Sequence, residues 1–208
     1  MRRFLIVLLG LIVLLVVVDR AGVFIAEREI STRVRSAYDL PATPHVTVRG
    51  IPFLTQLVSG HYQEIDVSIP SAKANGVQLR DISARFTGVH ASLSLLLGQN
   101  HGQITASHAT GTALLPYSQV ERKLPSGVKI APDGSNLRVS VATPLGTIRG
   151  VARLAVSRSV ITATLDNRFS YPIPVSGLPM HLSVTGVRVT QGGLVVDAAA
   201  HNVVFASG

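Results

Sequence analysis

The feature that most constrains the fold is an alternation of apolar and polar residues that begins near His45 and continues toward the C-terminus. In the stretch 63–69, for example, Ile65, Val67 and Ile69 alternate with polar residues. A period of two is typical of a β-strand that buries one face. The same period recurs in a short run at 45–50 and in the stretches 77–90, 103–115, 128–131, 137–143, 147–156, 159–168, 181–190 and 194–205.

Local signals indicate where these predicted strands bend and turn. The alternation within 77–90 slips near Arg80–Asp81, which predicts a β-bulge at that point. Asp133-Gly134 and Gln191-Gly192-Gly193 are typical of hairpin turns, because glycine adopts the backbone conformations that tight turns need.

Helices are few after His45. Short helices are expected at 54–59 and 117–124, each led by a proline, whereas SLSLLLG at 92–98 is ambiguous between helix and strand. About nine strands without a strand–helix–strand rhythm indicate an α+β, mainly β fold, with a curved antiparallel sheet or open barrel and one or two helices against it. No repeat or linker divides it, so residues 21–208 are expected to form one domain.

The first twenty residues have a different character. Arg2-Arg3 precede the uncharged run FLIVLLGLIVLLVVV at 4–18, and Asp19-Arg20 close it. A basic start followed by an apolar stretch is the signature of export or anchoring. At about 1.5 Å per residue the run covers about 22 Å of a hydrocarbon layer about 30 Å thick. Because no convincing small-residue cleavage site follows, we interpret 1–20 as an uncleaved transmembrane anchor; a removed signal peptide is the alternative.

The positive charges at the start set the expected orientation. The positive-inside rule keeps Arg2-Arg3 in the cytoplasm and places residues 21–208 on the extracytoplasmic side.

An amphipathic helix is predicted at 23–38, ended by Pro41 and Pro44. We expect it to run on from the anchor, and we favour packing on the domain's sheet over a position at the bilayer surface. Its apolar face comprises Val23, Ala26, Ile30, Val34, Ala37 and Tyr38.

Composition narrows the function classes. A hydrophobic content of 47% and a mean hydropathy of +0.40 exclude a disordered chain, and the absence of cysteine excludes disulfides and thiolate chemistry. The net charge of +8 falls to +6 beyond residue 20, after three arginines and one aspartate are removed. Those basic residues are dispersed, with no basic cluster next to aromatic side chains, so nucleic acid is not expected as a partner.

No motif for catalysis or cofactor binding stands out. The chain has no phosphate-binding glycine loop and no G-x-S-x-G elbow. Ser126 and Lys129 match S-x-x-K by letter only, because Lys129 lies in a predicted strand. The seven histidines form no metal-binding pair along the chain, although His101 and His108 could approach across a hairpin. We expect no catalytic residue, no metal and no cofactor.

Five arginines alternate with apolar residues along neighbouring predicted strands and are expected to form a positive outer face. Solvation of a sheet face is one interpretation, and attraction to anionic phospholipid headgroups is the functional one. These residues are Arg138, Arg149, Arg153, Arg158 and Arg168.

The segment VRGIPFLTQLVSG at 48–60 is distinctive, because a strand runs into a proline-led apolar turn and then a glycine. Together with QEIDVSI at 63–69, it resembles the opening of the actinobacterial LmeA-like family of phospholipid-binding envelope proteins. Further matches follow in order and extend the resemblance over nearly the whole chain: LRDI at 79–82 running into FTGVH, Leu178-Pro179, and GVRVTQGGLVVDAAAHNVVF at 186–205.

This resemblance implies an exported, membrane-associated, non-enzymatic protein. It implies a BPI-like (TULIP-like) half of a tubular lipid-binding fold, in which a long curved antiparallel sheet wraps around a helix and encloses an apolar groove. It also implies a phospholipid or another acyl lipid as partner, and a role in the upkeep of envelope lipids and lipoglycans. No catalytic motif can be carried over from the family, and only PFLTQ at 52–56 maps onto it closely.

A groove for an acyl chain needs apolar lining and no reactive group, because each buried methylene contributes about 0.8 kcal/mol. Ordinary core packing is the alternative for every apolar residue considered. The candidates for lipid contact are Phe53, Leu54, Leu57, Phe86, Leu95, Leu96, Tyr117, Val120 and Leu124.

The preferred hypothesis is a phospholipid-binding module on the outer face of the cytoplasmic membrane, with basic residues near the mouth of its groove. Two other classes stay open: a protein-interaction scaffold for envelope assembly, and an envelope hydrolase or acyltransferase.

Overall fold

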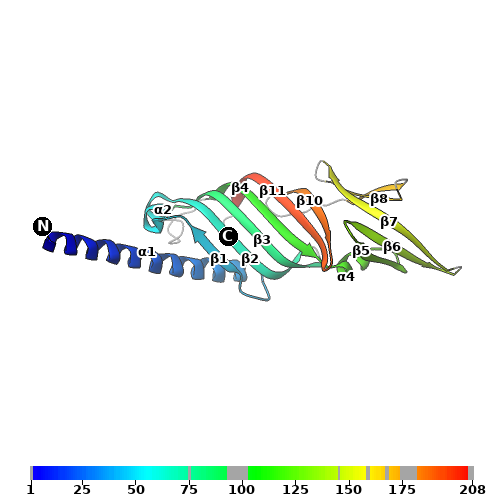
Figure 1. The fold of residues 1–208 in the computed structure, drawn as a ribbon, viewed down its shortest axis with the longest axis horizontal. Coiled ribbons are helices and arrows are strands. Elements are labelled where there is room, and N and C mark those ends of the chain that lie inside the picture. The colour runs from blue at the N-terminus through cyan, green and yellow to red at the C-terminus, as the bar shows by residue number, and fades with distance from the viewer. Residues whose placement is uncertain are drawn as a thin grey trace.

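The computed structural model describes residues 2–74, 76–92, 103–144, 146–157, 160–166, 169–173 and 182–205. The molecule is elongated (Figure 1). The N-terminal half of the first helix protrudes at one end, a six-stranded sheet lies in the middle, and a five-stranded sheet forms the other end. The α+β, mainly β class with an N-terminal helix is confirmed.

Helix α1 (Arg2–Ala37) joins the predicted anchor and the predicted amphipathic helix without a break. Its second half packs on the sheet through Val23, Ala26 and Ile30, as expected. Ala37 and Tyr38 were also expected on the buried face, but both are exposed. That expectation was wrong because the chain turns after α1, and Leu40 in this turn takes the buried position.

The six-stranded sheet is antiparallel throughout, and its strand order is β1-β2-β3-β4-β11-β10. Helix α2 (Phe53–Ser59) links its first two strands and ends at Gly60, whose φ of +69° gives the left-handed cap that glycine adopts readily. The strands are β1 (His45–Arg49), β2 (His61–Ala74), β3 (Val77–His90), β4 (Ile104–Leu115), β10 (Ser183–Thr190) and β11 (Gly193–Phe205).

The five-stranded sheet is inserted in the chain between β4 and β10, and it is also antiparallel. Helix α4 (Tyr117–Glu121), shorter than the predicted 117–124, leads into it. Its strands follow in sequence order: β5 (Val128–Asp133), β6 (Asn136–Thr143), β7 (Gly146–Ser157), β8 (Val160–Leu165) and β9 (Phe169–Ile173).

Several local predictions are confirmed. The register between β3 and β4 shifts between Arg80 and Ser83, and Asp81 has a φ of +46°, so the bulge lies where the alternation slips. The β5–β6 and β10–β11 hairpins turn at the two predicted glycine-containing positions. A single continuous sheet was expected, however, and the strands form two. Alternation reports that one face of a strand is buried, but it does not report which strand lies beside it.

Two hydrophobic clusters follow this division. The larger joins α1 and α2 to the six-stranded sheet and contains Phe53, whose side chain is 2% exposed. Burying one such side chain contributes about 1.5–3 kcal/mol. The smaller cluster lies where the two sheets meet, around Leu137, Ala152 and Leu194. Helix α1 is thus held on the six-stranded sheet, and the five-stranded sheet packs against the far end of the six-stranded sheet.

Candidate functional site

Helix α1 is fixed to the domain just beyond the apolar run. The Asp19 carboxylate, 3% exposed, accepts the backbone N–H of Leu54 at 2.9 Å, at the start of α2. Pro52 precedes α2 and supplies no side-chain cap, so Asp19 is the acceptor that the exposed N–H groups of a helix start require. Arg20 donates to the same carboxylate at 2.6 Å. The end of the apolar run is therefore attached to α2.

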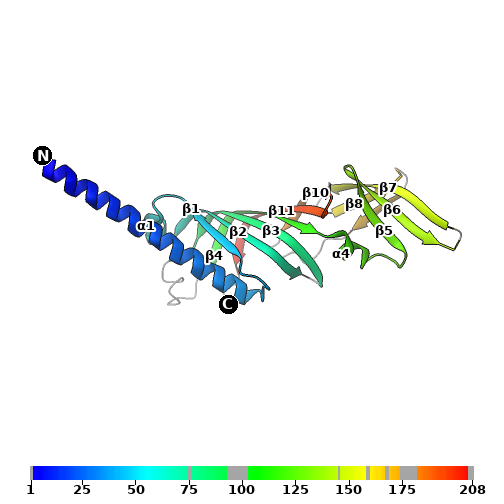
Figure 2. The same cartoon turned by 60° about the horizontal axis from the view of Figure 1, so that its bottom comes forward.

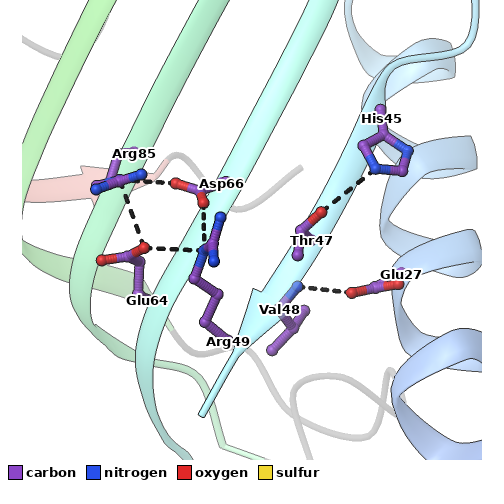
Figure 3. A network of polar contacts seen from close by, with 8 residues as sticks. All are labelled: Glu27, His45, Thr47, Val48, Arg49, Glu64, Asp66 and Arg85. Atoms are coloured by element: carbon purple, nitrogen blue, oxygen red, sulfur yellow. Dashed lines mark hydrogen bonds and ion pairs between the residues drawn. The ribbon is translucent and has the colours of Figure 1, made fainter. Parts of the chain in front are cut away.

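Two further residues of α1 hold β1, the edge strand that lies alongside α1 in Figure 2. Glu27 accepts the backbone N–H of Val48 at 2.8 Å (Figure 3), and the Ser31 hydroxyl donates to the carbonyl of Pro44. An edge strand leaves N–H groups free to pair with another chain, and Glu27 satisfies one of them. These contacts keep α1 over the apolar face of the sheet.

A groove of about 520 Å³ lies between α1 and the six-stranded sheet. Helix α1 forms one wall from Gly22 to Val34, and Phe53 of α2 packs against the Gly22 end. The volume is within the range of about 300–1,000 Å³ that is typical of small-ligand sites. The remaining lining comes from α2, the strands and their ends: Val48, Leu57, Tyr62, Ile65, Val67, Phe86, Val89, Ala91, Ile104 and Phe205.

Polar groups are few in this groove. Glu29 and Arg33 of α1 form an ion pair at 2.7 Å and are 59% and 62% exposed, which places them at the solvent rim. Tyr62 lines the interior and is only 6% exposed. Apart from these three, the described lining residues are apolar or glycine. Such a lining suits a hydrocarbon chain and gives no reactive group to act on it.

The way Tyr62 enters the groove depends on a local reversal of the pleat. Tyr62 and Ile65 both line it although they are three residues apart on β2, and so do Val89 and Phe86 on β3. A regular strand would point such residues to opposite faces. Gly88 lies between the β3 pair with a φ of +60°, and the strand register stays unchanged across it. Residues on both sides of this reversal therefore face α1.

The structure brings together three of the residues predicted to contact lipid, because Phe53, Leu57 and Phe86 all line the groove. Leu54 is beside them on α2 but is not part of the lining. The others are elsewhere: Tyr117 and Val120 pack in the cluster between the sheets, Leu124 follows α4, and Leu95 and Leu96 lie outside the described residues.

Sequence reasoning missed the contribution of α1 to the groove. Ile25, Ala26, Ile30 and Val34 form its helical wall. The helical period of 23–38 was the available signal, but it was interpreted as a core-facing surface. A helix that packs on a sheet and a helix that leaves a groove have the same apolar period.

Three of the five predicted basic residues, Arg138, Arg149 and Arg153, are on the five-stranded sheet. Arg138 on β6 is paired with Val151, which lies between Arg149 and Arg153 on β7, so the three arginines share one face. They do not line the groove, because their strands belong to the inserted sheet. The basic residues expected near the groove mouth are therefore not these three. Arg158 and Arg168 are outside the described residues.

The outer face of the six-stranded sheet carries a compact charge network (Figure 3). Arg49 donates to Asp66 at 2.6 Å and Arg85 donates to Asp66 at 2.8 Å, while Glu64 pairs with both arginines. Partial burial alone raises the pKa of Asp66, but the hydrogen bonds from Arg49 and Arg85 outweigh it and hold that pKa below its usual value. These groups neutralise one another and leave no net charge on this patch.

The residues that the structure describes contain no group of three or more His, Asp or Glu side chains that could hold a metal. His108 lies against His201, with ring centroids 4.8 Å apart, whereas His101 is outside the described part. One contact between a hydroxyl and an imidazole joins Thr47 and His45 at 3.4 Å on the exposed surface (Figure 3). Lys129, the lysine of the S-x-x-K match, forms an ion pair with Glu121 at 3.2 Å.

Among the described residues, α1 is long and apolar enough to cross a membrane.

A family model described as LmeA-like phospholipid-binding matches residues 17–199, which include the five-stranded sheet, most of the six-stranded sheet and the second half of α1. No curated protein and no solved structure matches the chain.

Proposed function

Because the chain belongs to the LmeA-like phospholipid-binding family, we propose that it is a non-enzymatic, membrane-anchored lipid-binding protein of the cell envelope. It would hold an acyl chain of a phospholipid in the groove between α1 and the six-stranded sheet, and serve the maintenance of envelope lipids or lipoglycans. The observation that carries this proposal is the groove itself, whose described lining is apolar except for one hydroxyl and a rim ion pair.

The energetics favour a hydrocarbon occupant. Each methylene moved from water into an apolar site contributes about 0.8 kcal/mol, so a chain of ordinary length can be held without any strong polar contact. The same apolar walls offer water few hydrogen-bond partners, so the groove disfavours water. An acyl chain is the component of a phospholipid that fits both conditions.

Residues 4–18 make no part of either hydrophobic cluster and are exposed along their length, as expected of a segment that lies in a bilayer. The same helix then becomes a wall of the groove. A continuous helix therefore brings the groove directly to the membrane surface, where its lipid would be taken up or delivered.

The membrane-facing end of the domain carries further apolar surface. Ile51 and Val58, just before and within α2, are 79% and 80% exposed. They lie in the segment that Asp19 attaches to α1, next to the end of the apolar run. The run covers only about 22 Å of a hydrocarbon layer about 30 Å thick, so shallow insertion of this end would offset the mismatch.

Orientation follows from the charges at the start of the chain. Arg2 and Arg3 would remain in the cytoplasm, which places both sheets on the extracytoplasmic side. Fusing a reporter enzyme that is active on one side of the membrane only to the C-terminus tests this orientation. Activity of a cytoplasm-only reporter would contradict it.

Photocrosslinking tests the binding site in the intact protein. The full chain is placed in nanodiscs that contain a phospholipid with a diazirine near the end of one acyl chain, and crosslinked peptides are mapped by mass spectrometry. We expect crosslinks on β2, β3 and residues 23–34 of α1, in addition to the anchor. Crosslinks confined to residues 4–18 would contradict the proposal.

A further inference from the structure

Tyr62 is a buried polar residue whose hydroxyl has no hydrogen-bond partner in the described part of the chain. Its side chain lines the groove and is 6% exposed, and its oxygen makes no hydrogen bond with any residue that the structure describes. Buried hydroxyl groups nearly always have a partner, because a buried donor that loses water and gains nothing costs free energy. An unpaired hydroxyl in a binding groove therefore points to a group that the ligand brings.

The described neighbours of the Tyr62 side chain are apolar. Val89 is its neighbour across β3, and the Phe53 ring lies with its centroid 6.3 Å away. Gly22 of α1 closes the same end of the groove against Phe53. Besides Tyr62, the described groove lining has only the rim residues Glu29 and Arg33 as polar side chains, which disfavours a water molecule, because it needs two to four polar partners. A ligand acceptor atom that is joined to an apolar chain needs only one hydrogen-bond partner.

The hydroxyl acts as a donor. Burial raises the pKa of Tyr62 above its ordinary value, so the phenol stays protonated at physiological pH. Its proton is available to an acceptor that can lie within an apolar groove without carrying a charge. A carbonyl oxygen meets this condition, whereas a phosphate would bring a charge into a groove whose charged lining residues, Glu29 and Arg33, already pair with each other.

The location of Tyr62 fits one part of a phospholipid. It lies at the end of the groove that α2 and Gly22 share. This end is next to Asp19, which follows the apolar run and attaches α1 to α2. The opposite end, near Val34, is twelve residues further along α1, or about 18 Å. A lipid that enters from the bilayer would direct its chain toward Val34 and leave its headgroup-proximal ester beside Tyr62.

We propose that the Tyr62 hydroxyl donates a hydrogen bond to the ester carbonyl of the bound lipid, and that the groove thereby selects ester-linked acyl lipids over ether-linked lipids of the same length and headgroup. This inference rests on the proposed function and adds the linkage class of the ligand to it. Gln56 also has an unpaired buried nitrogen, but it is not part of the groove lining.

A competition experiment in nanodiscs tests the selection. The full chain is reconstituted with a trace of diester phosphatidylglycerol that carries an acyl-chain diazirine. The host lipid is either diester phosphatidylglycerol or its dialkyl ether analogue with equal chains. An ester host should compete with the probe for the groove, whereas an ether host should compete less. We expect groove crosslinking to be about fivefold higher in the ether host.

The variant Tyr62→Phe should reduce this ratio to one, and crosslinking to residues 4–18 serves as the internal reference in every sample. Tyr117→Phe is the matched control, because the Tyr117 hydroxyl donates to the Thr190 carbonyl away from the groove. It should keep the fivefold ratio. Tyr62→Phe should also unfold at the same temperature as the wild type or higher, since no protein hydrogen bond among the described residues is lost.

The outcomes separate the inference from the function on which it rests. Groove crosslinking that is equal in both hosts, or a ratio that survives in Tyr62→Phe, would overturn the role of Tyr62 and leave lipid binding intact. An absence of groove crosslinks in both hosts, with the anchor still labelled, would overturn the proposed function itself.

Discussion

The six-stranded and five-stranded sheets are built from similar alternating strands, yet they present different surfaces. A helix lies over the apolar face of the six-stranded sheet and leaves a groove, while the charges on its outer face are paired. On the five-stranded sheet, Arg149 and Arg153 have no acidic partner among the described residues. What packs on a strand, more than its own pattern, decides whether it forms a binding site.

Filling the groove should give the largest effect. In Ala26→Trp an indole would occupy the space between α1 and β2, and we expect acyl-chain crosslinking to the groove to fall by more than about tenfold. Ala37→Trp adds the same side chain at an exposed position of the same helix and should have no effect. Unchanged groove labelling in Ala26→Trp would remove the distinction between the two sheets.

Breaking the attachment of α1 to α2 should give the second-largest effect. Asp19→Ala leaves the start of α2 without an acceptor, and we expect the free energy of unfolding of the domain to fall by about 1–3 kcal/mol. Denaturant unfolding of the full chain in micelles measures it. Glu29→Ala, which removes an exposed ion pair on the same helix, should cost well under about 1 kcal/mol. Equal effects of the two variants would contradict the attachment.

The arginines of the five-stranded sheet should give a smaller effect. If they meet anionic headgroups, each contributes about 1 kcal/mol at low salt. The double variant Arg149→Gln/Arg153→Gln should then weaken binding of the nanodisc-embedded protein to anionic vesicles about thirtyfold. A salt concentration of about 0.5 M, which screens charges strongly, should abolish the difference. Arg85→Gln should leave vesicle binding unchanged, because Arg85 is already paired. Equal vesicle binding by the double variant and the wild type would leave these arginines as solvated surface.

The charge network of the six-stranded sheet should give the smallest effect, seen as a pH dependence. The pKa of Asp66 is lowered in the folded state, so its contribution to stability is present above its ordinary pKa of 3.8 and is lost as the pH falls through the lower folded value. Acid unfolding of the wild type should therefore be steeper below pH 3.8 than that of Asp66→Asn. Parallel curves would show that the network contributes nothing.

The sequence predicted the strands well because alternation is a local property. The bulge near Asp81 and both glycine hairpins follow from residues within a few positions of each other. The division into two sheets could not be predicted in this way, because strand neighbours such as β4 and β11 are far apart in the chain. A single sheet was the simplest interpretation of one uninterrupted pattern.

The site was predicted in part. Phe53, Leu57 and Phe86 were found from an unusual apolar turn and an inward strand position. Tyr62 was not, because regular alternation would place it on the outer face with Glu64, and only the pleat reversal turns it inward. The reversal depends on backbone geometry that spans neighbouring strands, and no residue pattern within β2 reports it.

The most direct test of the account is contact between an acyl chain and the groove. The chain has no tryptophan, so a single tryptophan at Phe86→Trp is a unique fluorescent reporter. In nanodiscs of chain-brominated phospholipid, we expect its emission to be quenched relative to unbrominated lipid. The same quenching is expected for Val13→Trp in the anchor, whereas Tyr117→Trp should not be quenched. Unquenched Phe86→Trp beside quenched Val13→Trp would contradict an acyl chain in the groove.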